Sequence, residues 1–74
     1  MTMAEFRTAL DELPFKPFSL RMPDGRSIPV LHRDFVASAP AGRTAVVYQP
    51  NGRFNIVDVM LVSDLEYLPA KKPA

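Results

Sequence analysis

The chain has no cysteine and no tryptophan, and only one histidine, His32, among its 74 residues. Without cysteine there can be no disulfide bond, no thiolate nucleophile and no zinc site of the usual cysteine type. One histidine cannot form a metal cluster, and the sequence shows neither a glycine-rich phosphate loop nor a spacing typical of metal ligands. We therefore expect no metal, no cofactor and no catalytic residues, and the sequence predicts that the protein is not an enzyme.

Long apolar runs and strong net charge are also absent. No stretch approaches the roughly 20 apolar residues of a membrane-spanning helix, and the early charges Glu5 and Arg7 do not fit a signal peptide. The sequence thus predicts a cytoplasmic protein with no membrane partner. Nine basic against eight acidic residues give a net charge of +1, below the strongly basic balance typical of nucleic-acid binding. Basic residues nevertheless outnumber acidic ones six to two within residues 16–53.

Glycine is scarce, and all three glycines stand in the same pattern, Pro-x-Gly-Arg. The three copies are Pro23–Arg26, Pro40–Arg43 and Pro50–Arg53. Proline presets the first central position of a type I turn, and glycine accepts the left-handed conformation with which the chain re-enters a strand. Because runs of β-branched and aromatic residues separate these copies, each is predicted to be the tip of a hairpin.

The first residues carry the signals of an amphipathic helix. Thr2 and Glu5 stand three residues apart, in the order of a capping box. Apolar side chains then recur with helical spacing at Met3, Phe6, Leu10 and Leu13. Pro14 ends the pattern. The sequence therefore predicts a helix over residues 3–13, whose apolar stripe must dock on the strands.

Helix and turns together predict an α+β fold that is mostly β. The N-terminal helix is followed by a five-stranded antiparallel meander within residues 18–68. We expect a kink or a single turn at Leu31–Phe35, a buried 3₁₀ turn at Asp58–Leu61, and a strand edge or bulge at Pro29, which cannot donate to a ladder. Residues 1–69 are expected to form a single domain and residues 70–74 a flexible tail.

This order of elements resembles a known family. A helix, five short strands and a one-turn break before the last strand occur in small SH3-like barrels, and residues 3–68 resemble the Sm-like barrel in particular. In the bacterial Sm-like RNA chaperone a Tyr-Lys-His-Ala stretch before the last strand lines the RNA pore, whereas the sequence here is Asp58-Val59-Met60-Leu61. The Pro-Phe-x-Pro-Phe joint at residues 14–18 also resembles that of small uncharacterised bacterial proteins.

Two of the predicted strands carry apolar residues on both faces. Four large side chains are enough to fill the inside of a barrel of this size: Val46, Tyr48, Phe54 and Ile56. Val47, Val57 and Val59 would then point outward and form a candidate interface, because a row of exposed valines favours burial against another surface. The sequence thus predicts a protein-interaction or self-associating module, whose partner is itself or another protein.

Nucleic-acid binding is the alternative. In a simple meander the first and third hairpin tips lie at the same end of the sheet, which would bring Arg26 and Arg53 together with Arg21. These three arginines are the candidate nucleic-acid contacts. Single-strand binding also needs aromatic side chains among the charges, but Phe18, Tyr48 and Phe54 occupy positions that are predicted to be core.

Two acidic positions leave further alternatives. Asp34 lies two residues from His32, so the pair is either part of a hydrolytic site or a surface pair in a kinked strand. Asp58 stands in an apolar run and is either a perturbed acid or the cap of the following turn.

Overall fold

The computed structural model describes residues 1–39 and 41–69, which fold into one helix, six strands and two single 3₁₀ turns. In chain order the elements are α1 (Met3–Leu10), β1 (Phe18–Arg21), β2 (Ser27–Val30), η1 (Arg33–Phe35), β3 (Val36–Ser38), β4 (Thr44–Tyr48), β5 (Phe54–Asp58), η2 (Val59–Leu61) and β6 (Asp64–Tyr67). The predicted tail, residues 70–74, lies outside the described residues.

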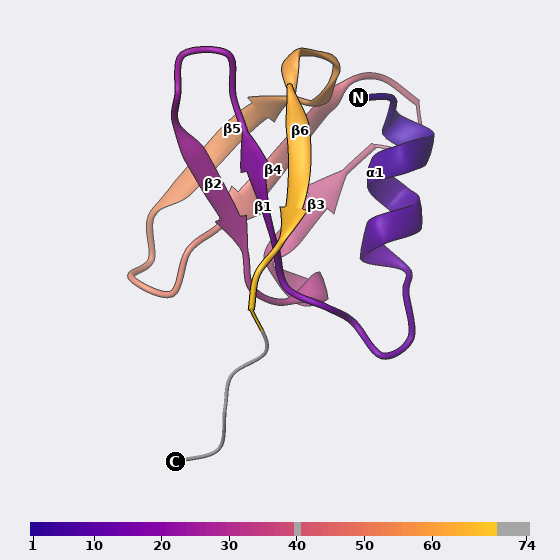
Figure 1. The fold of residues 1–74 in the computed structure, drawn as a ribbon, viewed down its shortest axis with the longest axis vertical. Coiled ribbons are helices and arrows are strands. Elements are labelled where there is room, and N and C mark those ends of the chain that lie inside the picture. Colours follow the sequence, from indigo (N-terminus) through magenta and orange to yellow (C-terminus); the bar gives the residue numbers. More distant parts are fainter. Residues whose placement is uncertain (40, 70–74) are drawn as a thin grey trace.

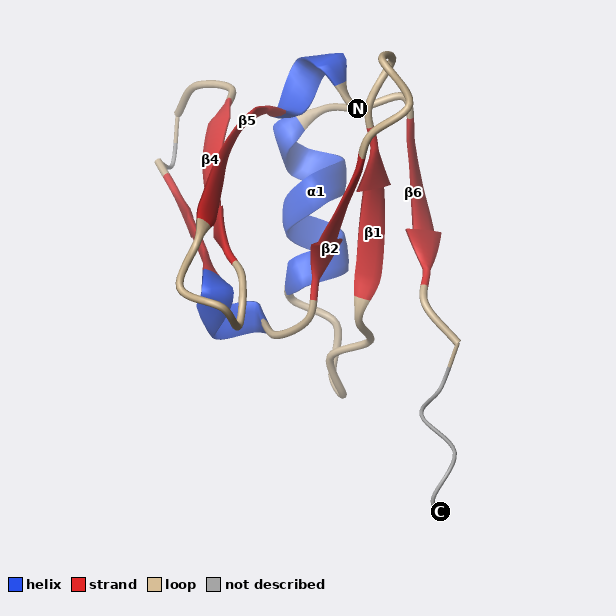
Figure 2. Ribbon diagram, turned by 90° about the vertical axis from the view of Figure 1, so that its left-hand side faces the viewer, coloured by secondary structure: helices blue, strands red, loops and turns tan. Residues whose placement is uncertain are grey.

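The strands form two three-stranded antiparallel sheets, in the orders β2-β1-β6 and β3-β4-β5. The sheets face each other, and α1 lies along one open side of the space between them (Figures 1 and 2). On the other side the edge strands β2 and β5 come near each other without pairing. The prediction of a mostly β protein with an N-terminal helix is confirmed, but the described strands do not close into a barrel.

The capping box at the start of α1 is confirmed. Glu5 N donates to Thr2 Oγ1 at 3.1 Å, and Thr2 N donates back to the Glu5 carboxylate at 2.8 Å. The helix ends at Leu10, three residues earlier than predicted, with Asp11 as its C-cap. Since a residue before proline avoids helical backbone, Leu13 leaves the predicted stripe and is 95% exposed.

The core lies between the sheets and under the helix. It is one cluster of buried apolar side chains: Phe6, Ala9, Leu10, Phe18, Leu20, Met22, Ile28, Val30, Ala45, Val47, Val57, Val59 and Val62. The ring of Phe6 on the helix meets the ring of Phe18 on β1 edge-on, with 6.3 Å between their centres. Phe15, in the joint, packs against Phe18 at 5.8 Å. The two phenylalanines of the joint therefore connect helix and sheet.

Two of the three hairpin tips share one hydrogen-bond pattern. Gly25 N donates to Met22 O and Met22 N to Arg26 O; at the other tip Gly52 N donates to Gln49 O and Gln49 N to Arg53 O. In each, the glycine has a left-handed φ, 91° for Gly25 and 87° for Gly52. This is a type I turn followed by a glycine bulge, as the Pro-x-Gly-Arg pattern predicts.

The predicted five-strand meander becomes six strands because the chain reverses at residues 31–35. His32 caps η1 by accepting from Asp34 N at 3.1 Å, and the turn carries the chain from β2 in one sheet to β3 in the other. One predicted strand is thus two. The extra reversal places the β1–β2 tip and the β4–β5 tip at opposite ends of the molecule (Figure 1).

The edge predicted at Pro29 is confirmed. The strand β2 lies at the outside of its sheet, where Pro29 stands opposite Ser19 of β1. Hydrogen-bonded and non-hydrogen-bonded residue pairs alternate along an antiparallel ladder. Counted from the Met22–Arg26 bond that closes this hairpin, Pro29 belongs to a non-hydrogen-bonded pair. The missing N–H of Pro29 therefore faces away from β1 and costs the ladder no bond.

Candidate functional site

The three valines of the predicted interface do not point outward. Val47 and Val59 have no exposed surface, and Val57 is buried as well. The predicted orientation of these strands is therefore wrong, and the three side chains belong to the core of the monomer. Small side chains suffice on this inner face, because Phe6 and Phe18 already supply much of the volume of the same cluster.

The large side chains that were expected inside lie instead on the opposite surface of the β3–β4–β5 sheet, which we call the outer face. Tyr48, Phe54 and Ile56 are 48%, 55% and 70% exposed, and Val46 is half-buried. The register aligns Tyr48 with Phe54 and Val46 with Ile56 across β4 and β5. The two aromatic rings are 5.7 Å apart between centres. The outer face is thus a contiguous apolar and aromatic surface.

One end of the outer face carries an ion pair. Thr44 and Asp58 face each other across β4 and β5. Arg43 Nε donates to Asp58 Oδ1 at 2.8 Å, and Arg43 Nη2 lies 2.7 Å from Asp58 Oδ2. This donation by Arg43 is the main cause that lowers the pKa of Asp58 below its ordinary value, and it raises the pKa of Arg43. The end is therefore polar but close to neutral.

Asp58 has a second role, which settles one alternative. Its Oδ1 accepts from Met60 N at 3.0 Å, so Asp58 is the N-cap of η2. In that turn Val59 is buried, while Met60 and Leu61 are about half exposed. The interpretation of Asp58 as a cap is confirmed, and the 3₁₀ turn begins one residue later than predicted.

The three candidate nucleic-acid arginines are not brought together. Arg21 Nη2 lies 3.1 Å from Glu66 of β6, and Arg26 Nε lies 2.8 Å from Asp24 in its own turn. Arg53 stands at the β4–β5 tip, at the end of the molecule opposite to Arg26. Among the described residues no carboxylate pairs with Arg53. Arg53 is therefore the one arginine of this set that leaves its charge available, and it stands next to Phe54 of the outer face.

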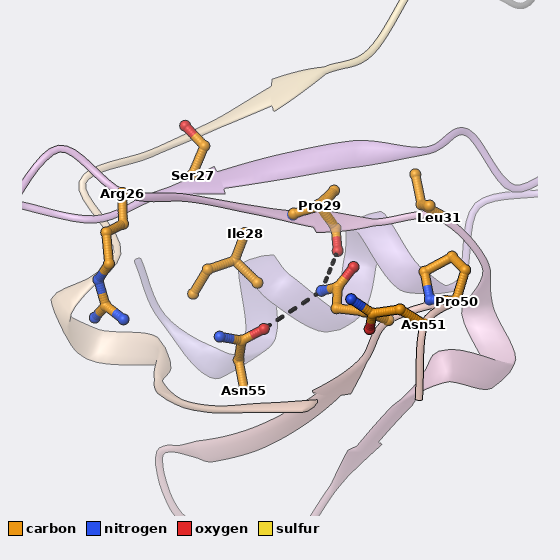
Figure 3. A pocket seen from close by; sticks show the side chains of 9 residues that line it. Arg26, Ser27, Ile28, Pro29, Leu31, Pro50, Asn51 and Asn55 are labelled. Atoms are coloured by element: carbon orange, nitrogen blue, oxygen red, sulfur yellow. Dashed lines mark hydrogen bonds between the residues drawn. The ribbon is translucent and has the colours of Figure 1, made fainter. Parts of the chain in front are cut away.

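A cleft lies between the edges of β2 and β5. Figure 3 shows Arg26 at one end and Pro50 and Asn51 at the other, with the polar side chain of Asn55 beneath. The Gln49 side chain crosses this cleft by donating to the Pro29 carbonyl at 3.1 Å and to Asn55 Oδ1 at 3.4 Å. Gln49 thus ties the two sheets together on the side that the helix leaves open.

A second, more apolar cleft lies beside the joint. Residues 15–17 form one wall, residues 67–69 the other, and Leu31 contributes from the loop after β2. The Tyr67 hydroxyl donates to the Glu12 carboxylate, which raises the pKa of Tyr67. This bond links the last strand to the end of the helix and helps to fix the joint between them.

Neither a metal site nor a hydrolytic site is assembled in the described part of the chain. Residues 1–39 and 41–69 hold no group of three or more histidine or acidic side chains that could bind a metal ion. His32 Nδ1 accepts from the backbone of Asp34, and both side chains are largely exposed. This geometry matches the surface pair in a turn rather than a hydrolytic site.

No helix in these residues is long and apolar enough to cross a membrane.

The sequence reasoning missed the outer face because both sets of alternating positions in β4 and β5 contain apolar residues. Ala45, Val46 and Val47 are all apolar, so periodicity could not say which set points inward. The polar Asn55 even favoured the wrong orientation, because it shares a face of β5 with Val57 and a polar residue is expected to face the solvent. In the structure Asn55 lies on the inner side, where Gln49 donates to it.

Comparison with known proteins yields no relative from which a family could be assigned. No family model, no curated protein and no solved structure matches this chain.

Proposed function

We propose that this chain is a small protein-interaction module that self-associates through the outer face of the β3–β4–β5 sheet. The observation that carries the proposal is the exposed cross-strand group of Val46, Tyr48, Phe54 and Ile56. Contiguous exposed apolar surface with aromatic residues is typical of interfaces. The surface is formed by two regular strands, β4 and β5, that pair along their whole length.

A second copy is the partner that we favour. A 74-residue domain buries a smaller fraction of its unfolded surface than a larger domain does, so it gains stability from association. An interface of standard size needs about 800 Å² per partner, which is about 15% of the 5214 Å² surface of this chain. Two sheets can pack face to face in an aligned arrangement, with the side chains of the facing surfaces interdigitated.

Charge along β5 also suits a twofold arrangement. The strand is preceded by Arg53 and ends at Asp58. If two copies pack with their β5 strands antiparallel, Arg53 of each copy lies near the neutral Arg43–Asp58 pair of the other. A parallel arrangement would place the two Arg53 charges together, so the antiparallel pair is favoured.

Sedimentation velocity at tens of micromolar tests the proposal. We expect the wild-type chain to sediment as a dimer and Ile56→Lys as a monomer with unchanged circular dichroism, because a lysine on this face must lose its water to be buried. Leu13→Lys is the matched control: Leu13 is also exposed but lies between the helix and the joint, so this variant should remain a dimer. A wild-type monomer of 8.3 kDa, or an Ile56→Lys dimer, would refute the proposal.

The structure also supports a second candidate, the binding of single-stranded nucleic acid to the same face. The aromatic rings of Tyr48 and Phe54 are exposed and adjacent, and Arg53 stands beside Phe54. Bases stack on such rings, and each stacked base contributes roughly 1 to 3 kcal/mol. The candidate is weakened by the ion pairs of Arg21 and Arg26, which leave the face with few available positive charges.

Fluorescence anisotropy with a labelled single-stranded oligonucleotide separates the two candidates. Binding that is lost in Phe54→Ala and Arg53→Gln, and that weakens as salt rises, would assign the face to nucleic acid. Arg26→Gln is the control, because it removes the same charge at the opposite tip. No anisotropy change for a chain that sediments as a dimer would leave self-association as the function of the face.

We also propose that the fold is a relative of the SH3-like and Sm-like barrels that has opened along β2 and β5. The order of helix and strands and the 3₁₀ turn before β6 support this relation, as does the pairing of β6 with β1. In this interpretation β2 and β3 together take the place of one meander strand, and η1 reverses the chain between them.

A further inference from the structure

A third cleft, between the helix and β3, is lined by two arginines. Its walls are formed by Arg7, Leu10 and Asp11 at the end of α1, Arg33 in η1, and residues 36–38 of β3. Its volume is about 350 Å³. The side chains that line this cleft come mainly from the helix and η1, so the cleft is separate from the outer face.

Arg7 is short of hydrogen-bond acceptors in this cleft. Its Nη2 donates to the carbonyl of Ala39. Its Nε is buried and has no hydrogen-bond partner in the described structure. Residues 1–39 and 41–69 also offer Arg7 no carboxylate within ion-pair distance. A buried donor without an acceptor is unfavourable. Because Nε is enclosed, a bound molecule can supply that acceptor only when the Arg7 side chain turns toward the cleft.

Arg33 adds a second positive charge. Its Nη2 lies 3.1 Å from Asp11 Oδ1, and both side chains are more than half exposed. An exposed pair of this kind is weak and is readily exchanged for another anion. The two guanidinium groups and the one carboxylate leave the cleft with a surplus of one positive charge. A ligand with a single negative charge would balance it.

We propose that this cleft binds a small carboxylate, with Arg7 as its main ligand and Arg33 as the second. A planar guanidinium donates two parallel hydrogen bonds to a planar carboxylate, and Nε is one of the donors in that geometry. Leu10 and Val36 supply apolar surface for the carbon atoms next to the carboxylate. Phosphate dianions are disfavoured, because their second negative charge would repel Asp11.

The carboxylate can belong to a free organic acid or to the C-terminus of a peptide, and three probes distinguish them. The probes are propionate, an N-acetylated dipeptide with a free C-terminus, and the amide of that dipeptide. Binding is followed by NMR through the Nε–Hε signals of the arginines. We expect a saturable shift of the Arg7 signal with propionate and with the acid peptide, and none with the amide. Tighter binding of the peptide than of propionate would identify a peptide C-terminus as the source, and the reverse order a free acid.

Variants decide whether these arginines are the site. We expect Arg7→Gln to lower the affinity about tenfold or more, since a charge-assisted hydrogen bond is lost. Arg33→Gln, which changes an exposed side chain, should lower it about threefold to tenfold without affecting folding. Arg53→Gln is the charge-matched control and should leave the affinity unchanged. The proposal is overturned if no saturable shift of Arg7 is seen up to about 50 mM propionate, a concentration far above millimolar affinity. It is equally overturned if Arg33→Gln binds like the wild type, or if inorganic phosphate binds more tightly than propionate.

Discussion

At the scale of single residues, glycine is required at the turn positions by its backbone conformation and not by lack of space. A side chain built at Gly25 or Gly52 would meet no atom within 4 Å. Both residues nevertheless have a left-handed φ, which β-branched side chains adopt only under strain. The cost of substitution is thus purely conformational.

We therefore expect Gly25→Val and Gly52→Val each to lower the free energy of unfolding by roughly 1 kcal/mol or more. Asparagine tolerates left-handed backbone, so Gly25→Asn and Gly52→Asn should cost clearly less. Urea denaturation of the four variants measures the difference. Equal stability of the valine and asparagine variants would show that the two turns are not held in this conformation.

Asp58 gives the protein a pH-dependent contribution to stability. Because Arg43 lowers the pKa of Asp58 in the folded state, the unfolded chain takes up the proton first as the pH falls. The stabilisation is therefore complete above the ordinary pKa of an aspartate. It is lost as the pH falls through the lowered folded pKa.

The prediction is that Asp58→Asn is less stable than the wild type near pH 7. This difference should shrink as the pH falls below the ordinary pKa of an aspartate, and it should disappear once Asp58 is protonated in the folded state. Part of the difference comes from the amide of Met60, for which an asparagine oxygen is the weaker acceptor. Urea midpoints of both proteins across this range provide the test. Thr44→Val, at the neighbouring position on β4, should show no such dependence on pH. A constant difference between Asp58→Asn and wild type would contradict the assignment.

At the scale of elements, the helix contributes to stability through its buried apolar stripe. Residues 11–13, which were predicted to extend the helix, do not contribute to this stripe. Phe6 and Leu10 are buried in the core, whereas Leu13 lies outside the helix and in solvent. An eight-residue helix is not stable alone, so its docking on the sheets is what keeps it folded.

Leu10→Ala should accordingly lower the free energy of unfolding by about 2 to 5 kcal/mol, the usual cost of a cavity in a packed core. Leu13→Ala makes the same chemical change at an exposed position and should alter stability by less than about 0.5 kcal/mol. Thermal and urea denaturation of the pair provide the measurement. If both variants lose the same stability, the helix extends further than residue 10.

At the scale of the whole molecule, the two faces of one sheet have opposite roles. Val47 faces the core and Ile56 faces the solvent, although they lie on neighbouring strands. A charge on the inner face must be buried without a partner, which a domain of this size cannot tolerate. A charge on the outer face remains in water as long as the chain is a monomer.

Val47→Lys is therefore expected to unfold the chain, while Ile56→Lys should keep the fold. Self-association adds a further expectation, because association stabilises the folded state by mass action. The thermal midpoint of the wild type should rise with protein concentration, and that of Ile56→Lys should not. Calorimetry over about a hundredfold range of concentration measures both. A concentration-independent midpoint in the wild type would count against self-association.

Local sequence by itself determined where the helix begins and where two of the hairpins turn. The capping box at Thr2 and Glu5 is a bond between residues three apart. The Pro-x-Gly-Arg tips at residues 23–26 and 50–53 depend only on the φ angles that proline and glycine allow. The missing N–H of Pro29 likewise limits its strand to an edge or a bulge. Such features involve neighbours in the chain, and no distant residue is needed to decide them.

Only the tertiary structure decided which face of β4 and β5 is buried and where the charges lie. Residues 45–47 are apolar at every position, so the alternation that normally fixes a strand in phase is missing. The volume left beside Phe6 and Phe18 decides the orientation, because only small side chains fit there. Tyr48 and Phe54 therefore face outward. In the same way the reversal at residues 31–35 separated Arg26 from Arg53, and the tertiary arrangement brought Arg7 of α1 and Arg33 of η1 to one cleft. These outcomes depend on how distant segments share space, which no single segment of the sequence specifies.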